Sequence, residues 1–558
     1  MQGKIEPVLI VGGGPVGLAL AGDLGWRGIG CVTIEQSDGS IYQPRMDLVG
    51  VRTMEFCRRW GLVPAVEGSP YPRDYAQDNI YLTSLIGHEL GRERFPGIGQ
   101  APPPKESPQR RERCPQNMFD PILRRFAASQ QSVTLRYRTR LISFTQNSDL
   151  VTAVVENADT GAREELLARY IVGCDGARSL VRETLGIGMV GNPVLTYTTN
   201  VIFRCPHLLS LHDRGKAYRH IFIGPEGTWS TIVAINGRDE WRLSIIGGAE
   251  ERQYTTQEIE AAIRRAVGRD FEFEILSVLP WVRRELVAER YRNGRGFIAG
   301  DAAHVMSPTG GFGMNTGIGD AVDLSWKLAA TIERWGGNGL LDSYGTERRP
   351  IGARNVGEAS GNLRRMLSVG RHPDLLDETP EGAATREKVG REFAEAMRRE
   401  WHTLGIHLGY RYEGSPICWP DGSKPPADDP KAYIPTARPG HRAPHAWLAD
   451  GRSTLDLFGQ GFVLLGFGAD TDEAAPLLKA SKQRQVPLTY IAIVEPQVAA
   501  LYQRRFVLVR PDGHVAWRDD RVPEDALHLI DIVRGAAEAP DTAALRAPVQ
   551  APNISAIL

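Results

Sequence analysis

The segment from Gly300 to Val322, GDAAHVMSPTGGFGMNTGIGDAV, combines glycines, a proline and acids ahead of residues with helical spacing. Glycine alone permits positive φ and close backbone contact, so such a loop is typical of a site where backbone lies against something flat or anionic. The apolar run just before it predicts a strand that ends in Asp301. We therefore expect a ligand beside this loop.

A second glycine-rich turn lies near the N-terminus, where the apolar run PVLIVG precedes GxGxxG. The spacing after it predicts a helix over 16–26 and a strand over 31–34. Such glycines allow close approach to a pyrophosphate, and the helix N-terminus supplies amide donors, while Glu35 stands where a ribose-binding acid belongs. The unit predicts binding of the ADP half of a dinucleotide. The residues expected to contact it are Gly12, Gly14, Pro15, Val16, Gly17, Glu35 and Gln36.

Acidic residues at the ends of two further predicted strands distinguish an FAD site from an NAD site. The segment Tyr170 to Arg182, YIVGCDGARSLVR, predicts a buried strand that ends in Asp175 and Gly176, and the strand before Gly300 ends in Asp301. An NAD domain has no need of these acids, whereas a carboxylate can accept hydrogen bonds from the ribityl hydroxyls of FAD. The sequence therefore favours FAD as the cofactor.

Three motifs in this order resemble those of the FAD-dependent aromatic hydroxylases, the single-component flavoprotein monooxygenases. They are GxGxxG with Glu35, the segment from Asp175 to Arg182, and GDAAHxxxPxxGxGxNxGxxDAxxLxWKLA from Gly300 to Ala329. The likeness extends over about the first 360 residues. Two later segments, 433–458 and 506–518, resemble the thioredoxin-like C-terminal domain of the phenol hydroxylase branch, here without CxxC.

The resemblance implies an α/β fold with a glutathione-reductase-like FAD-binding domain, an inserted, mainly antiparallel substrate domain and a thioredoxin-like C-terminal domain. Strand-like segments separated by turn residues, such as Val194 to Cys205 and Trp241 to Gly247, agree with the inserted sheet. The expected boundaries are 1–75, 110–190 and 286–365 for the FAD-binding domain, 76–109 and 191–285 for the substrate domain, 366–430 for a helical connection and 431–558 for the C-terminal domain.

A hydroxylase of this family accepts hydride from NADPH or NADH and transfers the distal oxygen of a flavin C4a-hydroperoxide, formed with O2. Because water would release peroxide instead, a dry pocket over the ring is part of the mechanism. The resemblance implies that Asp301 holds the ribityl chain or the neighbouring phosphate region, that Pro308 lies at the ring face where oxygen reacts, and that Gly311 to Asn315 pass the pyrimidine edge. The other implied flavin contacts are Arg45, Gln116, Gly300, Gly313 and Met314.

Asp47 is the principal candidate for substrate chemistry. It stands five residues before Arg52, where the resembling phenol hydroxylases carry an aspartate that deprotonates the substrate hydroxyl. A phenolate is more electron-rich than a phenol, so a base there would activate the ortho and para carbons. An exposed loop aspartate is the alternative. The other candidate substrate contacts, for which sheet packing is the alternative, are Tyr218, His220 and Trp229.

Charge and composition exclude several other functions. The formal charge of −1 arises from 66 basic and 67 acidic residues without a long block of one sign, which argues against nucleic-acid and membrane partners. No run approaches the roughly 20 apolar residues of a membrane span, and no signal peptide is evident. The six cysteines are scattered without metal-ligand spacing, so we expect reduced thiols, no metal site and a cytoplasmic location.

The sequence thus predicts an NAD(P)H-dependent monooxygenase whose small aromatic substrate is hydroxylated ortho to an existing hydroxyl, with loss of a nitro or halo group where one is present there. The resemblance also implies a homodimer. Two alternatives stay open: a halogenase or carbon–carbon-bond reductase on the same scaffold, and a non-catalytic FAD-binding interaction protein. No WxWxIP segment, such as halogenases carry, is found in the chain.

Overall fold

The computed structural model describes residues 4–539, which form two compact units. The first unit contains the described residues up to Ala329, together with Tyr344–Gly409 and Asp429–Tyr433. The second contains Ala330–Ser343, Tyr410–Asp428 and the described residues from Ile434 onward. None of the helices within residues 4–539 has the length and apolar character needed to cross a membrane.

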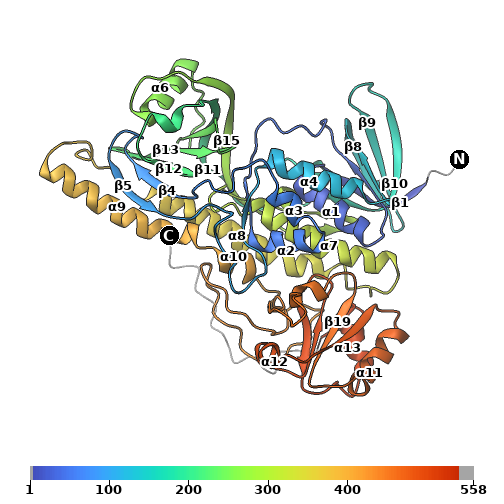
Figure 1. The fold of residues 1–558 in the computed structure, drawn as a ribbon. Helices are drawn as coiled ribbons and strands as arrows, with labels where there is room; N and C mark the ends of the chain where they lie inside the picture. The colour runs from blue at the N-terminus through green and yellow to red at the C-terminus, as the bar shows by residue number, and fades with distance from the viewer. Residues whose placement is uncertain (1–3, 540–558) are drawn as a thin grey trace. The chain divides into compact units, whose positions relative to one another are not determined.

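A largely parallel sheet carries the N-terminal glycine-rich turn (Figure 1). Five of its strands run parallel in the order β17-β10-β1-β2-β7, while β16 pairs antiparallel at one edge and β8 and β9 extend β10. Apolar runs such as VLIV at the end of β1 suit strands that are buried on both faces. The strands are β1 (Ile5–Val11), β2 (Cys31–Ile34), β7 (Val133–Arg136), β8 (Thr139–Gln146), β9 (Val151–Asn157), β10 (Arg163–Gly173), β16 (Arg292–Asn293) and β17 (Gly296–Ile298).

A second sheet of eight strands, here called the roof sheet, has the order β18-β15-β11-β14-β13-β12-β4-β5. Its neighbours pair antiparallel except for β12 and β4. One face packs on helix α6 (Thr256–Val267) through Ile259, Ile263 and Trp241. The strands are β4 (Asn79–Leu82), β5 (Glu89–Glu93), β11 (Met189–Arg204), β12 (Arg219–Gly224), β13 (Gly227–Ala234), β14 (Glu240–Ile246), β15 (Glu274–Ala288) and β18 (His304–Val305).

Helices connect these sheets and complete the first unit. Helix α9 packs along the roof sheet, where the ring of Phe393 meets that of Tyr81 edge-on at a centroid distance of 4.8 Å. A short sheet pairs β3 (Leu48–Val49) with β6 (Glu112–Arg113). The helices are α1 (Pro15–Trp26), α2 (Val51–Arg59), α3 (Val63–Glu67), α4 (Gln116–Ala128), α5 (Leu180–Thr184), α7 (Gly313–Ile332), α8 (Ser343–Leu367), α9 (Pro380–Trp401) and α10 (Leu404–Leu408).

The second unit has its own four-stranded sheet in the order β20-β19-β21-β22, in which β19 and β20 are parallel. Its elements are β19 (Phe462–Phe467), α11 (Thr471–Gln483), β20 (Leu488–Ile493), α12 (Pro496–Tyr502), β21 (Phe506–Val509), β22 (Val515–Asp519) and α13 (Ala526–Val533). The predicted α/β class is confirmed. The thioredoxin-like assignment and the domain boundaries stay predictions, and residues 540–558 of the last domain lie outside the described residues.

A buried carboxylate, Asp320 of α7, joins three segments of the first unit. Its Oδ2 accepts a hydrogen bond from the Gly300 amide at 3.1 Å and lies 2.8 Å from His304 Nε2. Its Oδ1 accepts from Arg348 Nε of α8 at 2.8 Å. Burial acts to raise the pKa of Asp320, but Arg348 and His304 outweigh it and lower that pKa. The ionised carboxylate therefore fixes the loop after β17 to α7 and α8.

We expect Asp320→Asn to destabilise the protein by about 3–5 kcal/mol, because Arg348 would keep a buried charge without its partner. A carboxyl whose pKa is lowered by folding stabilises above its unfolded value and loses this contribution as the pH falls. The difference in melting temperature between the wild type and the variant should therefore narrow only below about pH 4. Asp149→Asn, in an exposed turn, serves as the control; equal melting temperatures for all three proteins at pH 7 would contradict the assignment.

Candidate active site

A cavity of about 900 Å³ lies in the first unit, between the glycine-rich turn and the face of the roof sheet opposite α6. Its lining comes from both sheets, from the loop after β17 and from the end of α9. Of the predicted site residues, those that line it are Gly12, Gly14, Pro15, Val16, Glu35, Gln36, Arg45, Asp47, Gln116, Asp175, Gly176, Tyr218, Asp301, Pro308, Gly311, Gly313 and Met314.

The turn between β1 and α1 is shaped for an anionic group. Gly12 has φ 109°, and a Cβ there would lie 2.3 Å from the carbonyl oxygen of Cys174. Gly14, the N-cap of α1, has no side-chain cap and no atom within 4 Å of where a Cβ would stand. The first amides of α1 and the space beside Gly14 therefore fit a pyrophosphate. Gly17 lies behind the lining, where a Cβ would come 2.0 Å from the Gly12 carbonyl oxygen, so it serves close packing.

Glu35 fixes this turn from the end of β2. Its Oε2 accepts from the Gly13 amide at 2.8 Å, and its Oε1 accepts from the amide and hydroxyl of Ser37, each at 2.8 Å. The carboxylate is thereby held at the cavity edge, where it can accept from ribose hydroxyls. Asp175 differs, because its two oxygens accept from the Ser179 hydroxyl and the Val181 amide at the start of α5.

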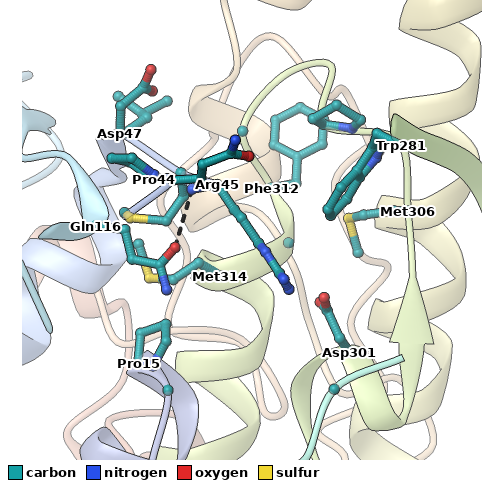
Figure 2. A pocket seen from close by; sticks show the side chains of 18 of the residues that line it. Pro15, Pro44, Arg45, Asp47, Gln116, Trp281, Asp301, Met306, Phe312 and Met314 are labelled. Atoms are coloured by element: carbon teal, nitrogen blue, oxygen red, sulfur yellow. Dashed lines mark hydrogen bonds between the residues drawn. The ribbon is translucent and has the colours of Figure 1, made fainter. Parts of the chain in front are cut away.

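Arg45 and Asp301 face each other across the cavity (Figure 2). The Arg45 guanidinium lies 5.5 Å from the centroid of the Trp281 ring. The backbone amide of Arg45 donates to Gln116 Oε1 at 3.1 Å. Gln116 is oriented in turn by Asp120, which accepts from its Nε2 at 3.0 Å. Removal from water raises the pKa of Asp301, while His304 and Arg45 act to lower it. These groups can bind the polar chain of a flavin cofactor.

The loop from Ser307 to Phe312 and the start of α7 are held by hydrogen bonds to their surroundings. Asn315 does not line the cavity; its Oδ1 accepts from the Gly50 amide and from Thr53 Oγ1, both at 2.7 Å, and its Nδ2 donates to the carbonyl oxygens of Leu48 and Gly311. Gly300 also lies behind the lining. These two predicted flavin contacts therefore position the loop, while Pro308, Gly311 and Gly313 border the cavity.

Pairing of β3 with β6 brings Asp47 beside Arg113. Arg113 Nη1 donates to Asp47 Oδ1 at 2.7 Å, and the Tyr218 hydroxyl donates to Oδ2 at 2.5 Å. The Arg113 guanidinium also lies 3.5 Å from the centroid of the Tyr218 ring. Burial acts to raise the pKa of Asp47, but Arg113, Arg242 and the Tyr218 hydroxyl together lower it. Burial also raises the pKa of Tyr218. The pair thus consists of an ionised carboxylate and a protonated phenol.

His220 and Trp229 are not among the residues that line the cavity, so the structure does not support them as substrate contacts. His220 follows Arg219 on β12, so the two side chains lie on opposite faces of the strand. Arg219 faces the cavity, and the ring of His220 meets that of His212 on the other face. Trp229 lies at a register shift between β12 and β13, and its side chain packs in the apolar core under α6. A β-bulge there changes the face of the sheet on which a residue lies. A prediction from strict alternation of inward and outward side chains along the strand therefore fails at this position.

The sequence had not led us to expect the arginines and the glutamate that line the cavity on the side of the roof sheet, here called the roof side. Arg219 Nη1 donates to Glu400 Oε1 at 2.8 Å, and the Gly310 amide donates to the same oxygen at 3.1 Å. Glu400 thus connects the roof sheet to the loop that contains Pro308. Charged residues within strand-like runs, such as Arg242 and Arg283, were a usable signal for inward-facing polar groups. Glu400, at the end of α9, had no comparable signal.

Comparison with known proteins decides the family. A family model described as FAD binding domain matches residues 6–359, and one described as aromatic-ring hydroxylase, C-terminal, matches residues 436–540. The chain belongs to the FAD-dependent aromatic hydroxylases. This aromatic hydroxylase is therefore an FAD-dependent monooxygenase, and the predicted family is confirmed.

Three similar proteins show the range of the family. The hydroxylase is 34% identical to a putative polyketide hydroxylase of Streptomyces halstedii over 92% of this chain and 93% of that protein. It is 34% identical to 4-methyl-5-nitrocatechol 5-monooxygenase of a Burkholderia species over 93% and 95% of the two chains. A solved structure of RebC with bound 7-carboxy-K252c matches with a TM-score of 0.89 and 42% identity, covering 96% and 100%. RebC has also been solved with reduced flavin.

Glu35→Gln is expected to raise the Kd for FAD about 10- to 100-fold, because a hydrogen bond to a charged group contributes about 1.5–3 kcal/mol. The side-chain amide of glutamine has only one acceptor oxygen, so it cannot accept from Gly13 and from Ser37 through two separate oxygens as the carboxylate does. Titration of the apoprotein with FAD, followed by flavin fluorescence, measures this change. Glu164→Gln on β10, whose exposed side chain pairs with Arg136, is the matched control. Equal Kd values for both variants would refute the role of Glu35.

Proposed function

We propose that the hydroxylase uses NADPH or NADH and O2 to hydroxylate a phenolic ring ortho to its existing hydroxyl. The observation that carries this proposal is the hydrogen-bonded Asp47–Tyr218 pair in the same cavity as the residues that fit FAD. When bound, FAD supplies hydride acceptance and the activation of O2. The chain itself supplies binding, orientation, proton handling and exclusion of water.

The Asp47–Tyr218 pair would activate the substrate hydroxyl through Tyr218. Because Tyr218 donates its own proton to Asp47, its oxygen lone pairs are free to accept from a phenol. Both oxygens of Asp47 are engaged, so Asp47 would act through Tyr218: the substrate proton would pass to the Tyr218 oxygen as Tyr218 passes its own proton to Asp47. The positive charges of Arg113 and Arg242 would stabilise negative charge that develops on the substrate oxygen. This refines the predicted role of Asp47 from direct base to partner of Tyr218.

Exclusion of water depends on the roof sheet and on the cavity wall below it. Leu279 and Trp281 of β15 lie over the cavity, and Met306 and Phe312 border it from the loop side. These side chains would cover the reacting ring once the substrate is seated, and a water-excluded site protects reactive oxygen species from release as peroxide. Pro308 borders the same space, where it would lie at the flavin ring face at which oxygen reacts.

Two finer features belong to the same proposal. If the target carbon bears a nitro or halo group, hydroxylation there would expel it; similarity to 4-methyl-5-nitrocatechol 5-monooxygenase supports a test with nitrophenols. Family membership favours hydroxylation over the halogenase, reductase and non-catalytic alternatives. The homodimer and the cytoplasmic location remain predictions.

Oxidation of NADPH and NADH by the FAD-loaded protein, with peroxide assayed in parallel, tests the proposal. The additives are phenols, nitrophenols, salicylates and multi-ring phenols. We expect strong stimulation by at least one compound with little peroxide, since effector binding and oxygen transfer would then be coupled. Stimulation accompanied only by stoichiometric peroxide, or no stimulation by any compound, would contradict the proposal.

Asp47→Asn and Tyr218→Phe are each expected to lower coupled hydroxylation about 100-fold while FAD is retained, because a positioned proton acceptor contributes about 10²- to 10⁴-fold. If the two residues act as one unit, the double variant should be no slower than either single variant. Asp213→Asn, on an exposed loop before β12, is the control. Additive losses in the double variant would show that the residues act independently.

A further inference from the structure

The roof side of the cavity carries an excess of positive charge. Five arginines line it, against two carboxylates, Asp47 and Glu400. The arginines lie close enough to influence one another: Arg219 and Arg242 both act to lower the pKa of Arg283, and Arg113 acts on that of Arg111. The five are Arg111, Arg113, Arg219, Arg242 and Arg283.

Both carboxylates are already paired. Asp47 pairs with Arg113 at 2.7 Å and Glu400 pairs with Arg219 at 2.8 Å. Among residues 4–539, neither Arg111, Arg242 nor Arg283 forms an ion pair. Three cationic side chains therefore face the cavity without a carboxylate partner.

The contacts of these three arginines are to neutral groups. Arg283 Nε donates to Thr198 Oγ1 at 3.0 Å, and its Nη1 donates to Ser307 Oγ at 3.4 Å. Arg111 donates to the carbonyl oxygen of Trp401 at 3.4 Å, and Arg242 donates to that of Pro44 at 3.2 Å. These bonds fix the guanidinium groups in place, while Glu400 acts on Arg283 and Arg242 acts on Asp47 only beyond ion-pair distance.

Arg283 is the most enclosed of the three, with an exposed fraction of 4%. Burial lowers the pKa of both Arg283 and Arg111 to about 10, so both remain charged at neutral pH. A buried cation without a partner is unfavourable, and an anion that binds there removes this cost. A planar guanidinium donates two parallel hydrogen bonds to a carboxylate, which suits it to such a ligand.

We propose that the aromatic substrate carries at least one carboxylate, which binds at Arg283 with Arg242 and Arg111 contributing positive charge. This inference rests on the proposed function, since it assigns the substrate class of the same cavity. The glycine-rich turn that fits the pyrophosphate of FAD lies elsewhere, between β1 of the other sheet and the N-terminus of α1. The carboxylate would complete the charge balance of the roof side, while Tyr218 receives the phenolic hydroxyl.

Binding of matched acid and amide probes to the oxidised, FAD-loaded protein tests this inference, read from the flavin absorbance change. The pairs are salicylic acid with salicylamide, and 3-hydroxy-2-naphthoic acid with its carboxamide. We expect one acid to bind about 10- to 100-fold more tightly than its amide, as a charge-assisted hydrogen bond predicts. Equal affinity within every pair, including no measurable binding of either member, overturns the inference.

Arg283→Gln should remove most of the preference for the acid, while Arg283→Lys, which keeps the charge, should retain part of it. FAD retention and amide affinity should change in neither variant, which separates this effect from misfolding. Arg204→Gln is the matched control, because Arg204 is on the roof sheet but outside the cavity lining and pairs with Glu274. A preference for the acid that is unchanged in Arg283→Gln overturns the assignment.

Two further outcomes separate the possible failures. If Arg283→Gln weakened NADPH binding and left the acid preference intact, the arginine would serve the nucleotide phosphates and the inference would be wrong. Loss of any acid preference with intact hydroxylation contradicts this inference alone. An intact acid preference without oxygen transfer to any compound contradicts the proposed function alone.

Discussion

The position of one buried carboxylate governs the geometry of the site. Asp320 binds the Gly300 amide, His304 and Arg348 at once, so the loop after β17 cannot move independently of α7 and α8. The same helix α7 carries Asn315 near its start, which holds the backbone at Leu48 and Gly50. Helix α7 therefore fixes two regions at once. One is the loop after β17 beside the expected cofactor site, and the other is the short β3–β6 sheet that brings Asp47 beside Arg113. A small displacement of α7 would be transmitted to both.

Local signals in the sequence indicated the residues that line the cavity on the side of the glycine-rich turn. Gly12, Gly14 and Glu35 follow from a strand, a tight turn and a helix in immediate succession, and Asp301 follows from its place at a strand end. The roof side depends on facts that are not local. The bulge at Trp229 changes which residues face inward, and Glu400 reaches the cavity only because α9 packs along the roof sheet. Three predicted contacts lie one layer behind the cavity lining: Gly17, Gly300 and Asn315. Close backbone packing and backbone hydrogen bonding require the same residue types there as contact with a ligand would, so the sequence could not separate the two roles.

Oxygen transfer as we propose it requires a cavity without water, yet this cavity is lined by many charged side chains. Ion pairs between these side chains lower the cost of keeping their charges away from water. Arg113 with Asp47 and Arg219 with Glu400 satisfy most of the ionic groups near the loop. Glu400 also accepts from the Gly310 amide, so the ion pair of the roof sheet braces the backbone next to Pro308. With the carboxylate substrate that we propose, substrate binding would also compensate the charge of the arginines that lack an ion pair. A cavity of this kind becomes dry when its proper ligand enters, which is the condition that oxygen transfer requires.

The most direct test of the account is the source of the oxygen in the product. The FAD-loaded protein would be given NADPH, a compound that stimulates its oxidation, and ¹⁸O₂ in unlabelled water, with the product analysed by mass spectrometry. We expect one ¹⁸O atom per product molecule, at a carbon next to the original hydroxyl, with one NADPH consumed for each product formed. A product without ¹⁸O, or NADPH consumption recovered entirely as hydrogen peroxide, would contradict it.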